Sequence, residues 1–408
     1  MKKDTRSDGQ PARKLAIILV LTAIPVLVGL VIAGVLISRA LYKPVIGFLD
    51  VPESVREAIE ETAIIESKIN NTAWKFLIID PSINLSELNK VIKKTDILIT
   101  KAGARAEALT TIQIPDQKLL SVMPTAIRKA ANSGNRQYGM PILLDHFELA
   151  WDRSNPVSSS FSPYSTLEQL EKLALSRTPK TTWPFLCAGG DDESLLSFIG
   201  ALTESLGGEK SWESARLDAK NTSPADLVRK ESFLNVMEIL LRWRREGLLH
   251  PEWFRMTLND VESFMKTNSA PFVFMSLSNH RKISQRTVEK YDSVLIPAFT
   301  ANTPRSLTAP AVLLLSTGKK REREESILLK SMLLNETTQT RLSEMTGLAP
   351  VNSTTAAPDR QANEARLWAA ASERPLPSFY TALYPYPADA ALLAKNIREF
   401  LQSDGAEN

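Results

Sequence analysis

The hydrophobic and polar positions divide the chain into one long apolar run followed by a series of short, alternating segments. Residues 15–37 contain no charged side chain. After residue 42, short apolar runs alternate with stretches in which apolar residues recur at helical spacing. Strands that alternate with helices are typical of an α/β protein, and this order predicts a parallel, doubly wound sheet.

Short apolar runs predict extended segments, and helical spacing with suitable capping residues predicts helices. The extended segments are expected at residues 45–49, 74–79, 95–100, 140–151, 183–190, 271–275 and 309–316. The helices are expected at residues 52–66, 85–94, 166–175, 193–206, 223–246, 257–267, 321–334, 336–345, 359–373 and 387–402. Between these elements, residues 154–165 read SNPVSSSFSPYS, a composition typical of a hinge or of a connection between lobes.

The run at residues 15–37 has the length of a membrane span, because its 23 residues extend about 34 Å as a helix. Five basic and two acidic residues precede it, so the positive-inside bias places the N-terminus in the cytoplasm and the rest outside. We therefore expect a cytoplasmic tail at residues 1–14 and an uncleaved anchor at residues 15–38. Residues 38–40 (SRA) resemble a cleavage site, so removal as a signal peptide stays open as the alternative.

The composition is that of a globular protein, with 43% hydrophobic and 23% charged residues and a net charge of +3 over 408 residues. This balance excludes a disordered chain and a polytopic membrane protein. The basic excess lies wholly in the N-terminal tail, so we expect no nucleic-acid surface. Cys187 is the only cysteine, which excludes an intramolecular disulfide.

Motifs for catalysis or for a bound cofactor are missing from the sequence. The three histidines and the one cysteine show no metal-binding spacing, and no Gly-rich phosphate loop or Gly-x-Ser-x-Gly motif occurs. Glycoside hydrolysis needs only two carboxylates, so that activity is unsupported rather than excluded. We expect no cofactor, no metal site and no enzymatic activity.

Four segments, in a fixed order along the chain, resemble a known family of proteins. They are residues 138–141 (YGMP) running into 148–151; residues 197–202 with 207–208; residues 223–251 followed by 270–275 (APFVFM); and residues 339–352, which end in TGLAPVN. Together they resemble the solute-binding proteins of ABC importers, in the large sugar-binding family that includes maltose-binding protein.

The resemblance implies an α/β, two-lobed fold of the periplasmic-binding-protein type II, which would follow the N-terminal transmembrane helix. Lobe 1 would comprise residues 42–150 and 307–358, and lobe 2 residues 156–305. The C-terminal helices, residues 359–408, would pack across the hinge. In such a fold the ligand lies between the lobes, which close on it by a hinge motion.

The implied function is that of a membrane-tethered, extracytoplasmic solute-binding protein, which captures a sugar or related polar solute for an ABC importer. Its partners would be the carbohydrate and the permease subunits in the membrane, and we expect a monomer. The alternative is a module that keeps the fold without transport, either a ligand sensor or a surface interaction protein.

Strand ends supply the first candidate ligand-binding residues. Asp50 follows the first expected strand, and Thr100 and Lys101 end the third, at the edge where α/β sheets bind ligands. Asp145 lies in the segment that crosses between the lobes. The alternative role of each polar residue is a helix cap or a surface ion pair.

Aromatic residues are further candidates, because a sugar presents apolar C–H faces and a rim of hydroxyl groups. Trp151 ends the crossover strand, and Trp183 lies in a TTWP loop; core packing is the alternative role of both. The resemblance further implies ligand contacts after the lobe 2 strand and in the late aromatic run, at Ser276, Asn279, His280, Phe379 and Tyr384.

Overall fold

The computed structural model describes a defined set of residues. These are 43–70, 73–109, 112–113, 117–134, 136–177, 182–267, 269–301, 307–308, 311–317 and 324–403. The predicted tail and anchor, residues 1–14 and 15–38, lie outside this set. Within it, no helix combines the length and the apolar character that crossing a bilayer requires.

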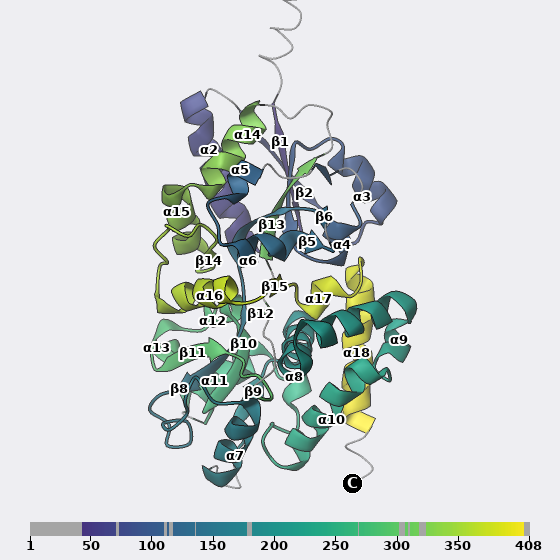
Figure 1. The fold of residues 1–408 in the computed structure, drawn as a ribbon, viewed down its shortest axis with the longest axis vertical. Helices are drawn as coiled ribbons and strands as arrows, with labels where there is room; N and C mark the ends of the chain where they lie inside the picture. Colours follow the sequence, from purple (N-terminus) through teal and green to yellow (C-terminus); the bar gives the residue numbers. More distant parts are fainter. Residues whose placement is uncertain are drawn as a thin grey trace, which may run out of the picture. The chain divides into compact units, whose positions relative to one another are not determined.

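Two separate sheets organise the described chain (Figure 1). The strands of the first sheet are β1 (Val45–Leu49), β2 (Lys75–Ile79), β3 (Ile97–Lys101), β4 (Ile112–Gln113), β7 (Met140–Leu144), β13 (Ala311–Thr317) and β14 (Ala349–Pro350). Their order is β14-β7-β13-β3-β1-β2, and β4 pairs with β13. The second sheet has the order β11-β8-β10-β9. Its strands are β8 (Phe147–Asp152), β9 (Phe185–Cys187), β10 (Phe272–Ser276) and β11 (Tyr291–Leu295).

The first sheet is mixed, which corrects the prediction of a parallel sheet. Strands β1, β2 and β3 are parallel to one another, as predicted. Strand β13 is antiparallel to β3 and to β7. Its second residue, Val312, pairs with Lys101 at the carboxyl end of β3, so the returning chain enters the sheet from that edge and must run the opposite way. Periodicity within a strand carries no information about this direction.

The expected extended run at residues 140–151 is divided between the two sheets. Strand β7 pairs with β13 in the first sheet, and β8 pairs with β10 and β11 in the second. Asp145 and His146 are the two residues between them, so the chain crosses there, before the Ser/Pro-rich connection.

Two pairs of short strands complete the description: β5 (Asn132–Ser133) with β6 (Arg136–Gln137), and β12 (Leu307–Thr308) with β15 (Pro375–Leu376).

The helices pack on these sheets and connect them. In chain order they are α2 (Glu53–Asn70), α3 (Leu85–Ile92), α4 (Ala104–Glu107), α5 (Gln117–Leu120), α6 (Thr125–Arg128), α7 (Leu167–Arg177), α8 (Asp192–Asn221), α9 (Pro224–Leu227), α10 (Glu231–Arg245), α11 (Leu258–Lys266), α12 (Leu277–His280), α13 (Gln285–Val288), α14 (Glu324–Leu334), α15 (Glu336–Thr346), α16 (Arg360–Ala371), α17 (Phe379–Ala382) and α18 (Pro387–Ser403). Two short 3-10 helices, η1 (Lys129–Ala131) and η2 (Trp253–Arg255), join them.

Two long helices are divided differently from the prediction. The helix expected to end at residues 207–208 continues as α8 to Asn221, with a kink at Gly208, where φ is +69°. The helix expected over residues 223–246 is broken into α9 and α10, because Lys230 has the extended backbone of a helix N-cap. Glycine therefore bends the first helix without ending it, and an ordinary lysine interrupts the second.

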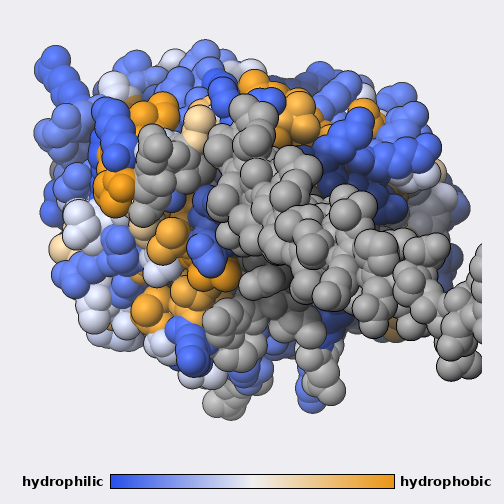
Figure 2. All heavy atoms as spheres, turned by 90° about the horizontal axis from the view of Figure 1, so that it is seen from above, coloured by the Kyte–Doolittle hydropathy of each residue, from blue (hydrophilic) through white to orange (hydrophobic). Residues whose placement is uncertain are grey.

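Each sheet has its own hydrophobic core. One buried cluster surrounds the first sheet and contains Ile97, Leu98 and Ile99 of β3. The other surrounds the second sheet and contains Trp212 and Trp243. Helix α16 contacts β14 and β11, and α17 contacts α4 and α8, so these helices touch both parts, whereas α18 packs on α8 and α9 in the second core. Viewed from the end where α2 and α14 lie, the described surface is largely hydrophilic, with smaller hydrophobic patches (Figure 2).

Candidate functional site

A cleft of about 830 Å³ is lined by residues from both sheets and their helices. Its lining residues are Pro52, Ser54, Lys101, Asp145, Gly190, Asp191, Glu193, Ser194, Ser197, Thr257, Leu258, Asn259, Ser276, Ser278, Asn279, Arg281, Lys282, Met345, Thr346 and Leu348. The set contains four of the predicted site residues, Lys101, Asp145, Ser276 and Asn279. A small hollow of about 30 Å³ shares Lys101 with the cleft and adds Asp50, Thr100 and Tyr384.

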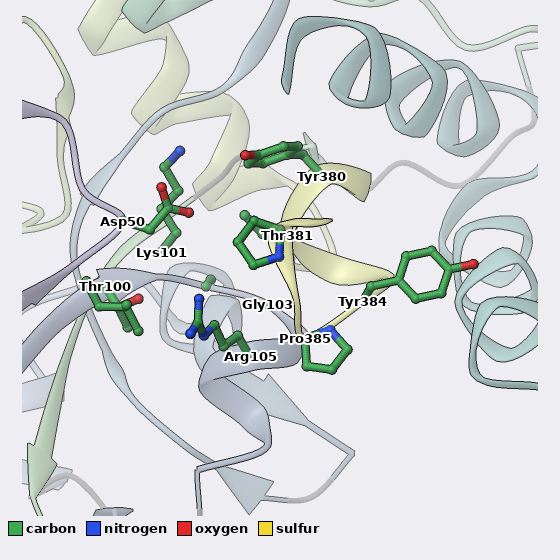
Figure 3. A pocket seen from close by; sticks show the side chains of 12 residues that line it. Asp50, Thr100, Lys101, Gly103, Arg105, Tyr380, Thr381, Tyr384 and Pro385 are labelled. Carbon is green, nitrogen blue, oxygen red and sulfur yellow. The ribbon is translucent and has the colours of Figure 1, made fainter. Parts of the chain in front are cut away.

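Asp50 and Lys101 lie beside each other because their strands are parallel neighbours. Leu49 of β1 pairs with Thr100 of β3, so the next residue of each strand emerges at the same edge. Asp50 has a φ of +52°, and among the described residues it alone combines a side chain with a positive φ. That left-handed backbone costs an aspartate roughly 1 kcal/mol. Its carboxylate lies next to the Lys101 side chain (Figure 3), so the strained turn serves this pair.

Lys101 also reaches across the cleft to α8. Its Nζ lies 2.8 Å from each carboxylate oxygen of Glu193, at the start of that helix. Burial by itself would lower the pKa of Lys101, but the carboxylates of Glu193 and Asp50 outweigh it and raise the pKa above its ordinary value. Lys101 therefore carries a fixed positive charge. Burial raises the pKa of Asp50, and Lys101 partly offsets this effect.

Tyr380 of α17 completes this edge of the site. Lys101 Nζ lies 5.6 Å from the centre of the Tyr380 ring, within the range of a cation–π interaction. The approach of α17 depends on Gly103, whose φ is +145° and where an added Cβ would overlap the carbonyl group of Thr381. Tyr384, by contrast, points away from Asp50 and Lys101 (Figure 3).

The second sheet contributes hydrogen-bonding groups that are held in place. Asp145 Oδ1 accepts a 3.0 Å bond from the Ser278 backbone N–H. Burial raises the pKa of Asp145, and the bonds from Ser278 partly offset this effect. The Ser276 hydroxyl caps α12 by accepting from the Asn279 N–H at 3.1 Å, and the Asn279 amide donates to Ser194 Oγ at 2.9 Å. These hydrogen bonds fix the orientation of the three side chains.

Three predicted aromatic contacts do not line the cleft. Trp151 is 7% exposed, packs edge-to-face on Phe161 and lines a different hollow. Trp183 contacts the His250 ring, with 4.3 Å between the ring centres. Phe379 is fully buried in the second core and stacks on Phe233. Complete burial in the core accounts for Phe379, because large apolar side chains gain most from it. Trp151 and Trp183 lie against other rings, outside the cleft.

His280 also points away from the cleft, into a buried cluster with Glu148 and His146. His280 Nδ1 lies 2.5 Å from one Glu148 oxygen, and His146 Nε2 lies 2.7 Å from the other. The Ser293 hydroxyl donates to Glu148 at 2.8 Å. Burial would raise the pKa of Glu148, but His280 and His146 outweigh it and hold that pKa far below its usual range. We call these three residues the His–Glu–His cluster.

Several cleft residues escaped the sequence analysis. Asp191, Glu193 and Ser194 follow the Gly189–Gly190 pair at the start of α8, and an acidic run there also suits a helix N-terminus, so it gave no separate signal. Arg281 lines the cleft while its Nε donates to the Gly347 carbonyl at 2.9 Å. Such residues can be identified as part of the cleft only from the folded structure, which brings distant segments of the chain together.

The site offers charges of both signs together with hydroxyl and amide groups. Such a set can hold a polar solute by many hydrogen bonds, since a ligand hydroxyl both donates and accepts. Among the described residues, no group of three or more His, Cys, Asp or Glu side chains is placed to hold a metal ion. The described cleft is thus suited to binding a polar organic molecule.

Known proteins resemble this chain in structure rather than in sequence. No family model and no curated protein matches the sequence. The bacterial solute receptor AcbH, described as having an exclusive preference for β-D-galactopyranose, superimposes with a TM-score of 0.69 at 11% identity over 88% of this chain and 98% of its own. The chain has the fold of the bacterial solute-binding proteins.

Two further solute-binding proteins show the same likeness. The binding protein MsmE of Bacillus subtilis, solved in an open conformation, has a TM-score of 0.66 at 14% identity, over 90% of this chain and 96% of its own. A cyclo/maltodextrin-binding protein in complex with maltotetraose has a TM-score of 0.59 at 12% identity, over 88% of this chain and 97% of its own. The solute-binding-protein fold therefore accounts for most of the chain.

Proposed function

We propose that this protein is an extracytoplasmic solute-binding protein that captures a sugar or a related polar solute in the cleft and delivers it to an ABC importer. The observation that carries the proposal is the Lys101–Glu193 pair. It joins β3 of the first sheet to α8 of the second with two 2.8 Å contacts at the cleft.

A bound sugar would exchange these protein contacts for its own. Its hydroxyl groups would accept from Lys101 and donate to Glu193, and Asp50 would accept a further hydroxyl. Tyr380 would supply an apolar face beside them. After the exchange Lys101 would still lie beside Asp50, and Glu193, which is partly exposed, would accept from a hydroxyl. Each charged group would thus keep a hydrogen-bonding partner, which is required because a buried charge without one is costly. Neighbouring structures described with galactopyranose or maltotetraose support a carbohydrate as the ligand.

The predicted lobes would link this exchange of contacts to a closing motion. We propose that each sheet with its core forms one lobe, that the chain crosses between them at Asp145–His146, and that ligand binding favours the closed arrangement. The predicted anchor at residues 15–38 would hold this monomeric body outside the membrane, near the permease subunits. Tethering raises the effective concentration of loaded protein at the permease.

A melting experiment with the full-length chain tests the proposal. The protein is held in a sugar-free detergent, and unfolding is followed by intrinsic tryptophan fluorescence with sugars, oligosaccharides, polyols and peptides. A ligand present at about a hundred times its Kd stabilises the folded state by about 2.7 kcal/mol. For a body of this size that shift amounts to several degrees in Tm. If no compound in any of these classes raises the Tm, the proposal is wrong.

The matched pair Glu193→Gln and Glu399→Gln shows whether the cleft is responsible. Glu193 pairs with Lys101 in the cleft, whereas Glu399 pairs with Lys395 on the surface of α18 at 3.7 Å. We expect Glu193→Gln to reduce the ligand-induced Tm shift and Glu399→Gln to leave it unchanged. Equal shifts in both variants would place the ligand elsewhere.

A further inference from the structure

A second hollow, of about 570 Å³, lies between the edge strand β11 and α16, which contact each other (Figure 1). We call it the β11–α16 groove. It is lined by Trp151, Pro163, Tyr164, Ser165, Thr166, Ser293, Val294, Leu295, Pro297, Ala298, Ala301, Arg360, Glu364 and Trp368. None of these residues lines the cleft. Its volume falls within the roughly 300–1,000 Å³ of small-molecule sites.

Helix α16 presents one continuous face to this groove. Arg360, Glu364 and Trp368 follow one another at intervals of four residues, so they lie along one side of the helix. Arg360 Nε lies 2.7 Å from Glu364 Oε1, and its Nη1 lies 3.2 Å from Oδ1 of Asp292 in β11. The charged groups at the rim are therefore fixed in position, and each keeps further donor or acceptor capacity.

Aromatic rings line the other parts of the groove. Trp368 is partly buried and packs against the His146 ring, with 5.3 Å between the ring centres. Trp151 is held edge-to-face on Phe161. Tyr164, in the Ser/Pro-rich connection, is 96% exposed. A large side chain exposed to that extent adds nothing to the core, and its ring is free to cover a ligand.

We propose that the β11–α16 groove is a second binding site, and that its ligand is a neutral saccharide. The aromatic rings match the apolar C–H face of a sugar ring. The Arg360–Glu364 pair and the Ser165 and Thr166 hydroxyls match its rim of hydroxyl groups. The groove shares no lining residue with the cleft, so this proposal can be tested separately from the proposed function.

The groove and the cleft meet through one chain of contacts. Ser293 lines the groove and donates to Glu148 of the His–Glu–His cluster. His280 of that cluster follows Asn279, which lines the cleft. A ligand in the groove also touches β11 of the second sheet and α16, which packs on β14 of the first. A saccharide bound there would therefore bridge the two sheets from outside the cleft.

Calorimetric titration of the full-length chain in sugar-free detergent tests the proposal. The probes are galactose, maltotetraose and stachyose, and binding is measured first in the Glu193→Gln background, in which the cleft is weakened. We expect at least one probe to bind with a stoichiometry near one in this background. Adding Tyr164→Ala or Arg360→Ala should weaken that binding by about tenfold or more, because each removes a major contact.

Arg255→Ala is the matched control, since Arg255 is also a partly exposed arginine paired with a glutamate, Glu252, at 3.1 Å. It should leave the affinity unchanged. Tyr164 and Arg360 are both on the surface, so their variants should fold, which the unchanged Tm without ligand would verify. The proposal is overturned if no probe binds the Glu193→Gln protein, or if Tyr164→Ala and Arg360→Ala bind as tightly as the background. If no ligand binds in the cleft but a probe still binds in the groove, the proposed function is wrong and the proposal of a second site is unaffected.

Discussion

The His–Glu–His cluster should contribute strongly to stability, and Glu148→Gln measures that contribution. Glu148, His146 and His280 are at most 1% exposed. The substitution keeps the size of the side chain and its contact with Ser293 but removes the negative charge between two imidazoles. Removing the charged partner of buried hydrogen-bonded groups typically costs about 1–3 kcal/mol or more. We expect a loss in this range near neutral pH, in a region where the chain crosses between the sheets.

The dependence of this loss on pH follows from the direction of the shift. The pKa of Glu148 is lower in the folded chain than in the unfolded chain. Its stabilising contribution is therefore complete above the unfolded value, about 4.3, and declines as the pH falls through that value toward the folded pKa. The difference in unfolding free energy between the two proteins should therefore shrink as the pH falls below about 4.

Urea unfolding followed by tryptophan fluorescence is the assay, with the slope m compared between proteins to verify that the same surface is exposed. A double-mutant cycle with His280→Gln isolates the pair at 2.5 Å. The double variant should lose less than the sum of the single losses, because the second change removes a buried polar group that the first left without its partner. Additive losses, or a Glu148→Gln loss below about 1 kcal/mol, would refute the reasoning.

Three further predictions concern single positions. Gly103→Ala should destabilise the protein to urea by more than about 2 kcal/mol, since its Cβ would overlap Thr381 at a φ of +145°; an unchanged midpoint would contradict the close approach. Asp50→Gly should leave stability unchanged or raise it by up to about 1 kcal/mol, because it relieves a φ of +52°, yet reduce the ligand-induced Tm shift in the melting experiment. Cys187 is fully buried, and burial raises the pKa of its thiol, so it should resist a thiol reagent until urea unfolds the chain; rapid labelling of the native protein would contradict this.

Local patterns predicted most elements of the fold, but not their partners. The apolar run at residues 45–49 is β1, and the helix expected over residues 359–373 is α16, which begins after an Asp359 cap. The direction of β13 and the division of residues 140–151 between two sheets depend on pairing with distant strands. No periodicity within those segments distinguishes these possibilities, because a buried strand looks the same in either sheet and either direction.

The residues of the candidate site also differ in whether the sequence alone could identify them. Asp50 and Lys101 could be found because strand ends at one edge of a parallel pair must be neighbours. Glu193 could not be found, because its position opposite Lys101 depends on how two separate sheets face each other. The aromatic candidates Trp151 and Phe379 were placed by residue type and by resemblance, and a ring that stacks on a ligand has the same sequence signature as one that fills a core.

The short helix α17 has a consequence for how the cleft could open. Its Thr381 lies against Gly103 beside the first sheet, while Phe379, two residues earlier, is locked into the core of the second. If the two sheets rotate against each other, as we propose, a segment held by both would lie near the axis, because points near an axis move least. Tyr380 would then shift little relative to Lys101, which lies 5.6 Å from its ring centre. Lys101 and Tyr380 would thus stay together while the cleft is open, and a solute could bind to this pair before the second sheet closes on it.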